Sequence, residues 1–524
     1  MRAQTTVGVL LSVLPLCAAA QQYDLLIRNG RVLDGSGNPW YYADIAVSGD
    51  RIAAVGKLQS ATARRVIDAR GLYVAPGFID PHSHAADGLE SAQLSGAEPL
   101  LAQGVTTVLI NPDGGGPVDL AAQRRALLAH GLGVNVAQLV PHGSVRRAVL
   151  GMSDRAPTPA ELERMKQLVR QGMREGAFGL SSGPYYAPGS YSTTEELIEL
   201  AKVAAEFGGA YTSHIRDEAD YNIGLVAAVD EVIRISREAG LPGVVTHIKA
   251  LGPRVWGYSL ALVERINRAR SEGIEVLADQ YPYEASGTSI TGALVPRWAL
   301  VGGDTALRRR LEDPAELARL RADMLENLDR RGGADRLQFR RHRADPSIEG
   351  RTLAEVARER GKEPVDLAIE ILKAGGASVV SFNMSETDIE ILMKQPWTMT
   401  CSDGDLVPMG EGVPHPRSYG TFPRKIRLYA VERGVIDLAS AIRSMTSLPA
   451  TVFRIADRGT IREGAYADLV VFDLGRLTDR ATYQEPHQLA EGMVYVLVNG
   501  GLAIDQGRFT GAKNGRVLQR RPGE

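Results

Sequence analysis

Two histidines separated by a single residue, His82 and His84, follow an apolar run and could bind a metal ion together. The run ends in Phe78-Ile79, so we expect a strand that stops just before the histidines. Residues i and i+2 of a strand point to the same face, so both imidazoles can turn into one pocket and share a cation. Two surface histidines can show the same spacing, so a metal site requires further ligands from other parts of the chain.

Other histidines and two aspartates also stand at or just beyond the ends of predicted strands, although the chain has only nine histidines. The complete set is His82, His84, Asp113, His214, His247 and Asp403. Four imidazoles and two carboxylates suit one or two divalent ions of the zinc type, with one position open for water. Such an ion lowers the pKa of water to about 7 and polarises a carbonyl. Asp403 could then take the proton of the water and pass it to a leaving nitrogen. The pattern predicts metal-assisted amide hydrolysis, and the alternative is that each histidine is a satisfied core residue.

The segments that must position these residues alternate between apolar strands and helices. After the first strand, the predicted strands lie at 105–110, 134–140, 178–181, 210–214, 244–247 and 274–279, with an eighth before Asp403. Capping boxes at Thr158–Glu161 and Ser192–Glu195 begin two of the helices between them. The repeated βα unit predicts an α/β fold, a (β/α)8 barrel of the TIM type, in which the carboxyl ends of all strands meet at one face. A doubly wound sheet is the alternative.

Short alternating segments with Asn-Gly and Gly-Asp turns lie on both sides of this middle region. We expect residues 21–75 and 451–524 to form one small β-sandwich from both termini, and residues 76–450 to form the barrel. The alternation breaks at about 288–348, where the chain becomes helical and rich in arginine. We interpret that stretch as an insertion near the barrel mouth. Basic runs of this kind are usually solvated helix faces, so no chemistry is assigned to them.

The first twenty residues have the layout of a secretory signal peptide, with Arg2, an apolar run from Val7 to Cys17, and Ala18-Ala19-Ala20. We expect cleavage after Ala20 and a periplasmic or secreted protein, and a lipoprotein anchored at Cys17 is the second interpretation. The apolar run is too short to span a bilayer, so no integral membrane span is expected.

The mature chain would keep one cysteine, Cys401, and therefore no internal disulfide. A net charge of −2 over 524 residues gives no reason to expect a nucleic-acid partner, and a small-molecule substrate is the better expectation. The sequence leaves the oligomeric state open.

Several stretches of the chain match the motifs of one family. They are Pro76–His84, Gly176–Gly183, Tyr211–Glu218, Thr246-His247-Ile248-Lys249, Asp279–Tyr283, Ser402-Asp403-Gly404 and His415-Pro416-Arg417. Over essentially all of its mature length the chain resembles the amidohydrolase superfamily, and more narrowly the D-aminoacylase (N-acyl-D-amino-acid deacylase) family. The resemblance implies a metal-bearing barrel and a zinc-dependent hydrolase of linear amides, acting on N-acyl-D-amino acids or related D-configured substrates. A cyclic amide or lactone hydrolase on the same barrel is the closest rival, and a catalytically silent binding protein is the other.

The resemblance also implies roles for individual residues. His214 and His247 would bind a tightly held zinc ion, and Asp403 would be the catalytic acid and base. A weaker second ion would lie at His82 and His84. The residues implied in binding the carboxylate or the scissile group of the substrate are Lys249, Tyr186, Ser286 and Arg417.

The chain departs from the family at Asp113, where the D-aminoacylases carry a zinc-binding cysteine. A carboxylate can replace a thiolate as a ligand and can also bridge two ions. The change allows a binuclear site, and it leaves open whether the substrate is that of the family. The alternative is that Asp113 is a turn residue bonded within its own loop. Two further histidines, His142 and His415, are expected on loops at the catalytic face, in structural or substrate-loop positions. No role is proposed for His130, His342 and His487.

Overall fold

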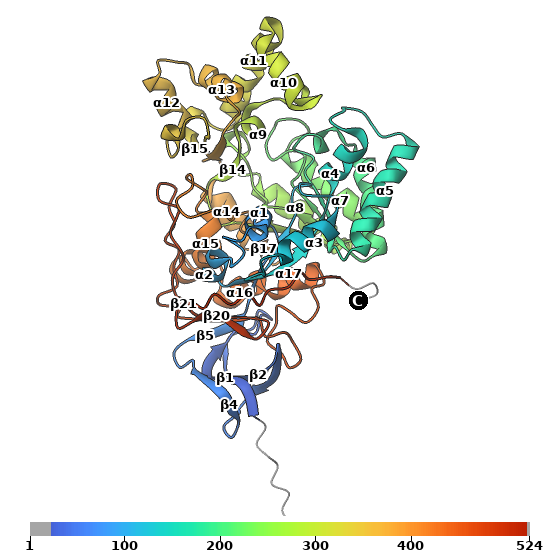
Figure 1. Cartoon of the computed structure of the whole chain (residues 1–524). Coiled ribbons are helices and arrows are strands. Elements are labelled where there is room, and N and C mark those ends of the chain that lie inside the picture. Colours follow the sequence, from blue (N-terminus) through green and yellow to red (C-terminus); the bar gives the residue numbers. More distant parts are fainter. Residues whose placement is uncertain (1–21, 521–524) are drawn as a thin grey trace, which may run out of the picture.

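The computed structural model describes residues 22–520, so the secretory signal expected at residues 1–20 lies outside the described part of the chain. A central barrel carries a sheet built from both termini at one end and an inserted unit at the other (Figure 1). The predicted barrel with a separate β unit is confirmed. No helix within residues 22–520 is both long and apolar enough to cross a membrane.

Parallel strands form the barrel, in the order in which they follow one another along the chain. They are β6 (Phe78–Asp80), β7 (Val105–Ile110), β8 (Asn135–Gln138) continued by β9 (Val140–Pro141), β10 (Gly179–Ser182), β11 (Ala210–Ser213), β12 (Gly243–Val245), β13 (Val276–Gln280) and β17 (Thr398–Thr400). The Leu139 N–H, between β8 and β9, donates to the Ile110 carbonyl at 3.2 Å and joins β9 to β7. The Asp403 N–H donates to the His82 carbonyl at 2.9 Å and links the end of β17 to the end of β6. The carboxyl ends of all these strands therefore meet at one face.

Every residue of β7 and of β10 to β13 is buried, so both faces of these strands are covered and none has an exposed polar face. Helices cover them on the outside. The helices that follow barrel strands or pack beside them are α3 (Leu120–Leu128), α4 (His142–Leu150), α5 (Pro159–Arg174), α6 (Thr194–Glu206), α7 (Leu225–Ala239), α8 (Ser259–Ser271), α14 (Glu386–Met393), α16 (Leu438–Met445) and α17 (Ser447–Val452).

Local caps fix where these helices begin. α5 has the predicted capping box, because the Thr158 hydroxyl accepts from the Glu161 N–H while Glu161 bonds back to Thr158. The capping box predicted at Ser192–Glu195 is wrong, because the helix begins one residue later and only one of the two bonds of a box is present. Thr193 is the N-cap of α6 and accepts from the Glu196 N–H at 3.2 Å. The Ser192 hydroxyl instead donates to the Gly189 carbonyl at 2.7 Å, which closes the turn before the helix.

The two chain ends form one nine-stranded sheet. Its strands are β1 (Gln22–Val32), β2 (Tyr41–Ser48), β3 (Arg51–Gly56), β4 (Thr62–Asp68), β5 (Tyr73–Pro76), β18 (Leu469–Phe472), β19 (Met493–Val498), β20 (Gly501–Asp505) and β21 (Arg508–Phe509). Antiparallel pairing of β5 with β18, Leu469 opposite Pro76, joins the N-terminal strands to the C-terminal ones. A shared apolar cluster that includes Ile45, Val74 and Leu497 fills the space between them.

The inserted unit has a sheet and a core of its own. It contains β14 (Ser286–Ser289), α9 (Ile290–Leu294), α10 (Gly303–Glu312), α11 (Pro314–Arg330), β15 (Leu337–Arg341), α12 (Leu353–Glu359), α13 (Pro364–Lys373) and β16 (Ser378–Ser381). The insertion extends past the expected range of about 288–348, because β16 returns to pair with both β14 and β15. In Figure 1 this unit stands beyond the barrel on the side opposite the terminal sheet.

Candidate metal centre

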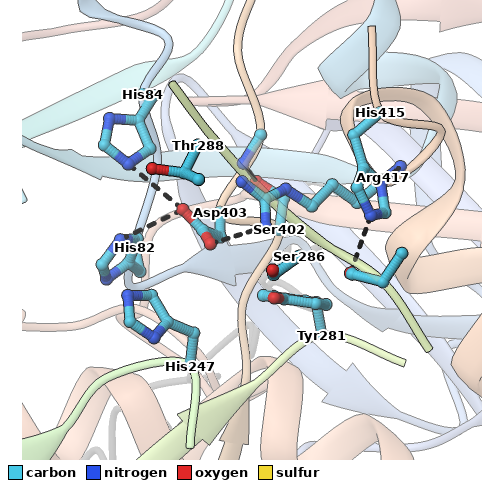
Figure 2. A network of polar contacts seen from close by, with 12 residues as sticks. His82, His84, His247, Tyr281, Ser286, Thr288, Ser402, Asp403, His415 and Arg417 are labelled. Atoms are coloured by element: carbon cyan, nitrogen blue, oxygen red, sulfur yellow. Dashed lines mark hydrogen bonds and ion pairs between the residues drawn. The ribbon is translucent and has the colours of Figure 1, made fainter. Parts of the chain in front are cut away.

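Hydrogen bonds join the end of β6 to the end of β17 and place Asp403 beside His82 and His84. The His84 N–H donates to the Gly404 carbonyl at 3.0 Å. The buried Asp80 carboxylate accepts from the backbone N–H of Ser402 at 2.9 Å and from that of His82 at 3.3 Å. As a result, Asp403 Oδ1 lies 3.4 Å from His82 Nε2 and 3.1 Å from His84 Nε2 (Figure 2). Asp80 was not singled out in the sequence, although it lies in the motif that carries the histidines.

Asp113 lies between both histidine pairs. Its Oδ1 is 3.5 Å from His82 Nε2, 3.6 Å from His247 Nε2 and 3.9 Å from His214 Nδ1, and its Oδ2 is 3.3 Å from His84 Nε2. Oδ1 is buried and has no hydrogen-bond partner, so the side chain points to the histidines rather than bonding within its own loop. One carboxylate thus faces all four imidazoles.

The backbone around Asp113 is tightly packed and unusual. Asp113 has a left-handed φ of 56°, and a Cβ at Gly183 would lie 2.2 Å from the Asp113 carbonyl oxygen. His247 and Asp403 also have positive φ, 37° and 49°. Non-glycine residues rarely adopt this region, and they cluster at functional sites where the surrounding structure holds them. Three residues of the predicted ligand set therefore lie in a conformation that costs free energy.

His214 and His247 follow β11 and β12, and their rings lie 4.5 Å apart between centroids. Glu218, four residues after His214, is buried and lies 3.1 Å from His247 Nδ1 and 3.7 Å from His214 Nε2. Lys249 forms an ion pair with Glu218, and its Nζ lies 2.7 Å from His247 Nδ1. Sequence reasoning missed Glu218, because an acidic residue in a loop has no periodic relation to the strand before it.

Two observations indicate that these residues could hold a metal ion: the type and spacing of their ligand atoms, and several buried polar atoms that have no hydrogen-bond partner. Two groups place their ligand atoms within 4.8 Å of one another, and Asp113 belongs to both. The first group is His82, His84, Asp113 and Asp403, and the second is Asp113, His214 and His247. Buried atoms without a hydrogen-bond partner include His82 Nε2, Asp113 Oδ1 and both ring nitrogens of His214. Nitrogen and carboxylate donors in this arrangement suit zinc. The structure thus brings all six predicted ligands together, and their role as ligands remains a prediction.

The electrostatics of the pocket favour a positive charge. Burial lowers the pKa of His84, but Asp113 and Asp403 outweigh burial and raise it to about 9. Burial lowers the pKa of His214 to about 3, so this imidazole is neutral and keeps a free lone pair. Burial would raise the pKa of Asp403, but Arg417, 2.7 Å from Oδ2, and His247 hold it well below its usual value. Asp403 is therefore ionised beside the histidines.

A cavity of about 720 Å³ lies over these residues, and all four residues predicted to bind substrate line it: Lys249, Tyr186, Ser286 and Arg417. Their side chains are held from different elements. The Tyr186 hydroxyl lies 3.2 Å from Thr288 Oγ1, and Ser286 Oγ lies 3.0 Å from the Asn383 amide. Arg417 pairs with Asp403, so its charge holds the predicted catalytic carboxylate as well as facing the cavity. Their contact with substrate remains a prediction.

Several residues of the inserted unit also line the cavity, which the sequence did not indicate: Thr288, Arg331, Arg340 and Ser378. Of the two histidines expected on loops, His142 is instead the first residue of α4. His415 Nδ1 accepts from the Arg417 N–H at 3.0 Å and so fixes the start of α15 (Arg417–Arg424). His142 is bonded to Glu196 at 2.8 Å and does not line the cavity. It has a structural position beneath the catalytic face.

A parallel barrel with imidazoles and carboxylates gathered at its carboxyl face defines a metal-dependent hydrolase. Residues 65–503 match the model of the Amidohydrolase family, and the chain belongs to that family. The expected likeness to the D-aminoacylases is confirmed, because D-aminoacylase from Alcaligenes xylosoxydans xylosoxydans is 36% identical over 96% of this chain and 98% of the relative.

Two solved structures extend the comparison. A D-aminoacylase with a binuclear metal centre superposes with a TM-score of 0.81 at 33% identity, covering 95% of this chain and all of that one. N-acyl-D-glutamate deacylase from Bordetella bronchiseptica, in complex with zinc and a phosphonate mimic of the tetrahedral intermediate, superposes with a TM-score of 0.80 at 34% identity, with the same coverage.

Proposed function

We propose that the protein is a zinc-dependent hydrolase that removes the acyl group from N-acyl-D-amino acids. The observation that carries the proposal is the ionised carboxylate of Asp403, held by Arg417 beside two histidine pairs that share Asp113. The named activities of the relatives, on N-acyl-D-amino acids, support the choice of substrate. Zinc bound there would supply Lewis-acid polarisation of the amide carbonyl and a lowered pKa for water.

Asp403 is placed to move the proton. Its Oδ1 faces the histidines, and its Oδ2 is held by Arg417, so the carboxylate cannot turn away. In the reaction a C–O bond forms from water to the acyl carbon and the C–N bond breaks. The proton taken from water by Asp403 passes to the leaving nitrogen, which departs as the free amine of the amino acid.

The strand order gives the substrate a direction across the barrel mouth. Lys249 follows β12 and Ser286 follows β13, whereas the Asp113–Gly116 loop follows β7, on the opposite half of the ring. The carboxylate of the amino acid would lie at Lys249, since a fixed cation can hold an anionic head group. The acyl group would then extend over Gly114, Gly115 and Gly116, which line the cavity without side chains.

The test is hydrolysis by zinc-loaded protein of matched N-acetyl-D- and N-acetyl-L-amino acids, with a cyclic amide such as a hydantoin as a third substrate. We expect measurable turnover of a D-substrate and much less of its L-enantiomer. Turnover of the cyclic amide without any turnover of the N-acyl-D-amino acids would overturn the proposal and favour the cyclic amidase.

We also propose export to the periplasm or beyond, on the basis of the signal-like residues 1–20. Expression in a Gram-negative host followed by fractionation and intact-mass measurement tests it. A soluble periplasmic product beginning at Gln21 supports export, a membrane-bound product carrying lipid on Cys17 supports the lipoprotein alternative, and an uncleaved product in the cytoplasm contradicts both.

A further inference from the structure

Glu218 lies on the outer side of both His214 and His247. His247 turns Nε2 towards Asp113, at 3.6 Å, and Nδ1 towards Glu218 Oε1, at 3.1 Å. His214 turns Nδ1 towards Asp113, at 3.9 Å, and Nε2 towards Glu218 Oε2, at 3.7 Å. Each ring therefore has one nitrogen facing the shared ligand candidate and the opposite nitrogen facing one oxygen of a single carboxylate.

Glu218 is itself fixed. Its side chain is buried and paired with Lys249, and its carbonyl accepts from the Leu251 N–H at 2.9 Å, which ties the loop after β11 to the loop after β12. We propose that Glu218 is a positioning residue that sets the ring orientation of His247 by accepting a hydrogen bond from its outer nitrogen, while it faces His214 at 3.7 Å only as a charge. Carboxylates in this position fix the tautomer of a ligating histidine and raise its basicity.

A rival arrangement must be separated from this one, because Lys249 Nζ lies 2.7 Å from His247 Nδ1. Lys249 could donate to that nitrogen, with Glu218 serving only as the counter-charge of a buried lysine. In a neutral imidazole one nitrogen carries the proton and the other offers the lone pair. If the lone pair is on Nε2, facing Asp113, then Nδ1 carries the proton and can only donate. Of its two neighbours only Glu218 can accept that hydrogen bond.

The two arrangements predict different behaviour when both buried charges are removed together. Glu218→Ala alone leaves Lys249 buried and unpaired, which could destabilise the whole loop. The double variant Glu218→Ala/Lys249→Met leaves neither charge. If Glu218 orients His247, zinc affinity stays low in the double variant. If Glu218 only neutralises Lys249, zinc affinity returns to the wild-type value.

The experiment measures the affinity for the first equivalent of zinc by competition with a chelator, on the full mature chain, with circular dichroism to confirm folding. Loss of a carboxylate behind a metal-binding histidine typically weakens metal affinity by about 10 to 100-fold. We expect a loss in this range for Glu218→Ala and for the double variant. In the Lys249→Met background, Glu218→Gln keeps an acceptor oxygen and should recover part of the affinity.

Glu196→Gln is the matched control. Glu196 is also buried and faces a histidine and a cation, His142 and Arg146, but none of the three lines the cavity. The zinc affinity of the Glu196→Gln variant should equal that of the wild type. Wild-type affinity in the double variant, or no recovery with Gln relative to Ala, would overturn the proposal. Because the measurement is metal affinity, its outcome does not depend on which amide the enzyme cleaves.

Discussion

The two histidine pairs of the metal centre are built differently. His214 and His247 have side chains that are 6% and 2% exposed, and Glu218 backs both of them. His84 is 34% exposed at the edge of the cavity, and its ion pairs run through Nε2 to Asp113 and Asp403. Both side chains of the first pair are enclosed, and Glu218 lies behind them. In the second pair His82 is also enclosed, at 1% exposed, and only His84 opens widely to the cavity, beside the predicted catalytic carboxylate of Asp403.

This difference predicts that the two pairs would exchange their metal ions at different rates. An ion held at the enclosed pair would exchange slowly, because both of its imidazoles are almost completely buried. An ion at the second pair would exchange faster and would lie beside Asp403. This order agrees with the expectation, based on the family resemblance, that His214 and His247 hold the tighter ion. Metal removal should perturb the centre most, and single substitutions should perturb it progressively less.

Removing all metal should abolish hydrolysis without unfolding the barrel, because the apolar core is large enough to fold without a metal. During stepwise chelation, the ion at His82 and His84 should leave first. Elemental analysis, activity and circular dichroism on the same samples check this. Full activity in the metal-free protein would show that hydrolysis needs no metal. Loss of both ions at the same rate would contradict the predicted difference between the two pairs.

Asp403→Asn keeps the shape of the side chain but removes the base. We expect turnover to fall by about 10²-fold or more, as is usual for loss of a general acid or base, with nearly unchanged zinc at the enclosed pair. Steady-state kinetics and metal content on one preparation measure both. Near-normal turnover would mean that another group moves the proton.

Asp113 faces both histidine pairs, so replacing it should affect the binding of the two ions differently. Asp113→Ala should bind at most one equivalent of metal and be nearly inactive, because its carboxylate offsets the repulsion between two ions. Asp113→Cys should favour a single tight zinc through its softer thiolate and recover some activity on N-acyl-D-amino acids. Metal stoichiometry and turnover for both variants test this. Unchanged stoichiometry with retained activity in Asp113→Ala would show that Asp113 bridges nothing.

Lys425 provides a contrast to the Lys249–Glu218 pair at the enclosed histidines, because it is buried with hydroxyl partners only. Its Nζ donates to Thr400 Oγ1 at 2.8 Å and to Ser444 Oγ at 3.1 Å. Burial lowers its pKa from 10.5 to about 7. Between these values the unfolded chain binds a proton that the folded chain has lost, so the free energy of unfolding rises with pH.

Replacing this lysine, as Lys425→Met, should remove that dependence. The free energy of unfolding of the wild type, relative to the variant, should increase from about pH 7 to pH 10, by at most about 1.4 kcal/mol per pH unit. Chemical denaturation of the metal-free proteins at several pH values measures it. A difference that is constant over this range would mean that Lys425 titrates normally.

The barrel could be predicted from the sequence, and so could the meeting of the six candidate ligands at one of its faces, while their role as ligands stays a prediction. The apolar runs mark parallel strands buried on both faces, and strand ends converge wherever such strands close into a ring. This rule alone predicts that His82, Asp113 and His247, which are far apart in the chain, lie close together in the fold. The capping box at Thr158 was equally local, and it was found where the pattern placed it.

Features without any periodicity came only from the tertiary structure. Glu218 reaches the site from the loop after β11, and Asp80 reaches it from the last residue of β6 by bonding to the distant Ser402. The insertion continues to Ser381 because β16 pairs with β14. The shared position of Asp113 among four imidazoles depends on a left-handed backbone held by neighbouring loops. Such features arise from contacts between distant segments, so local propensity and spacing carry no trace of them.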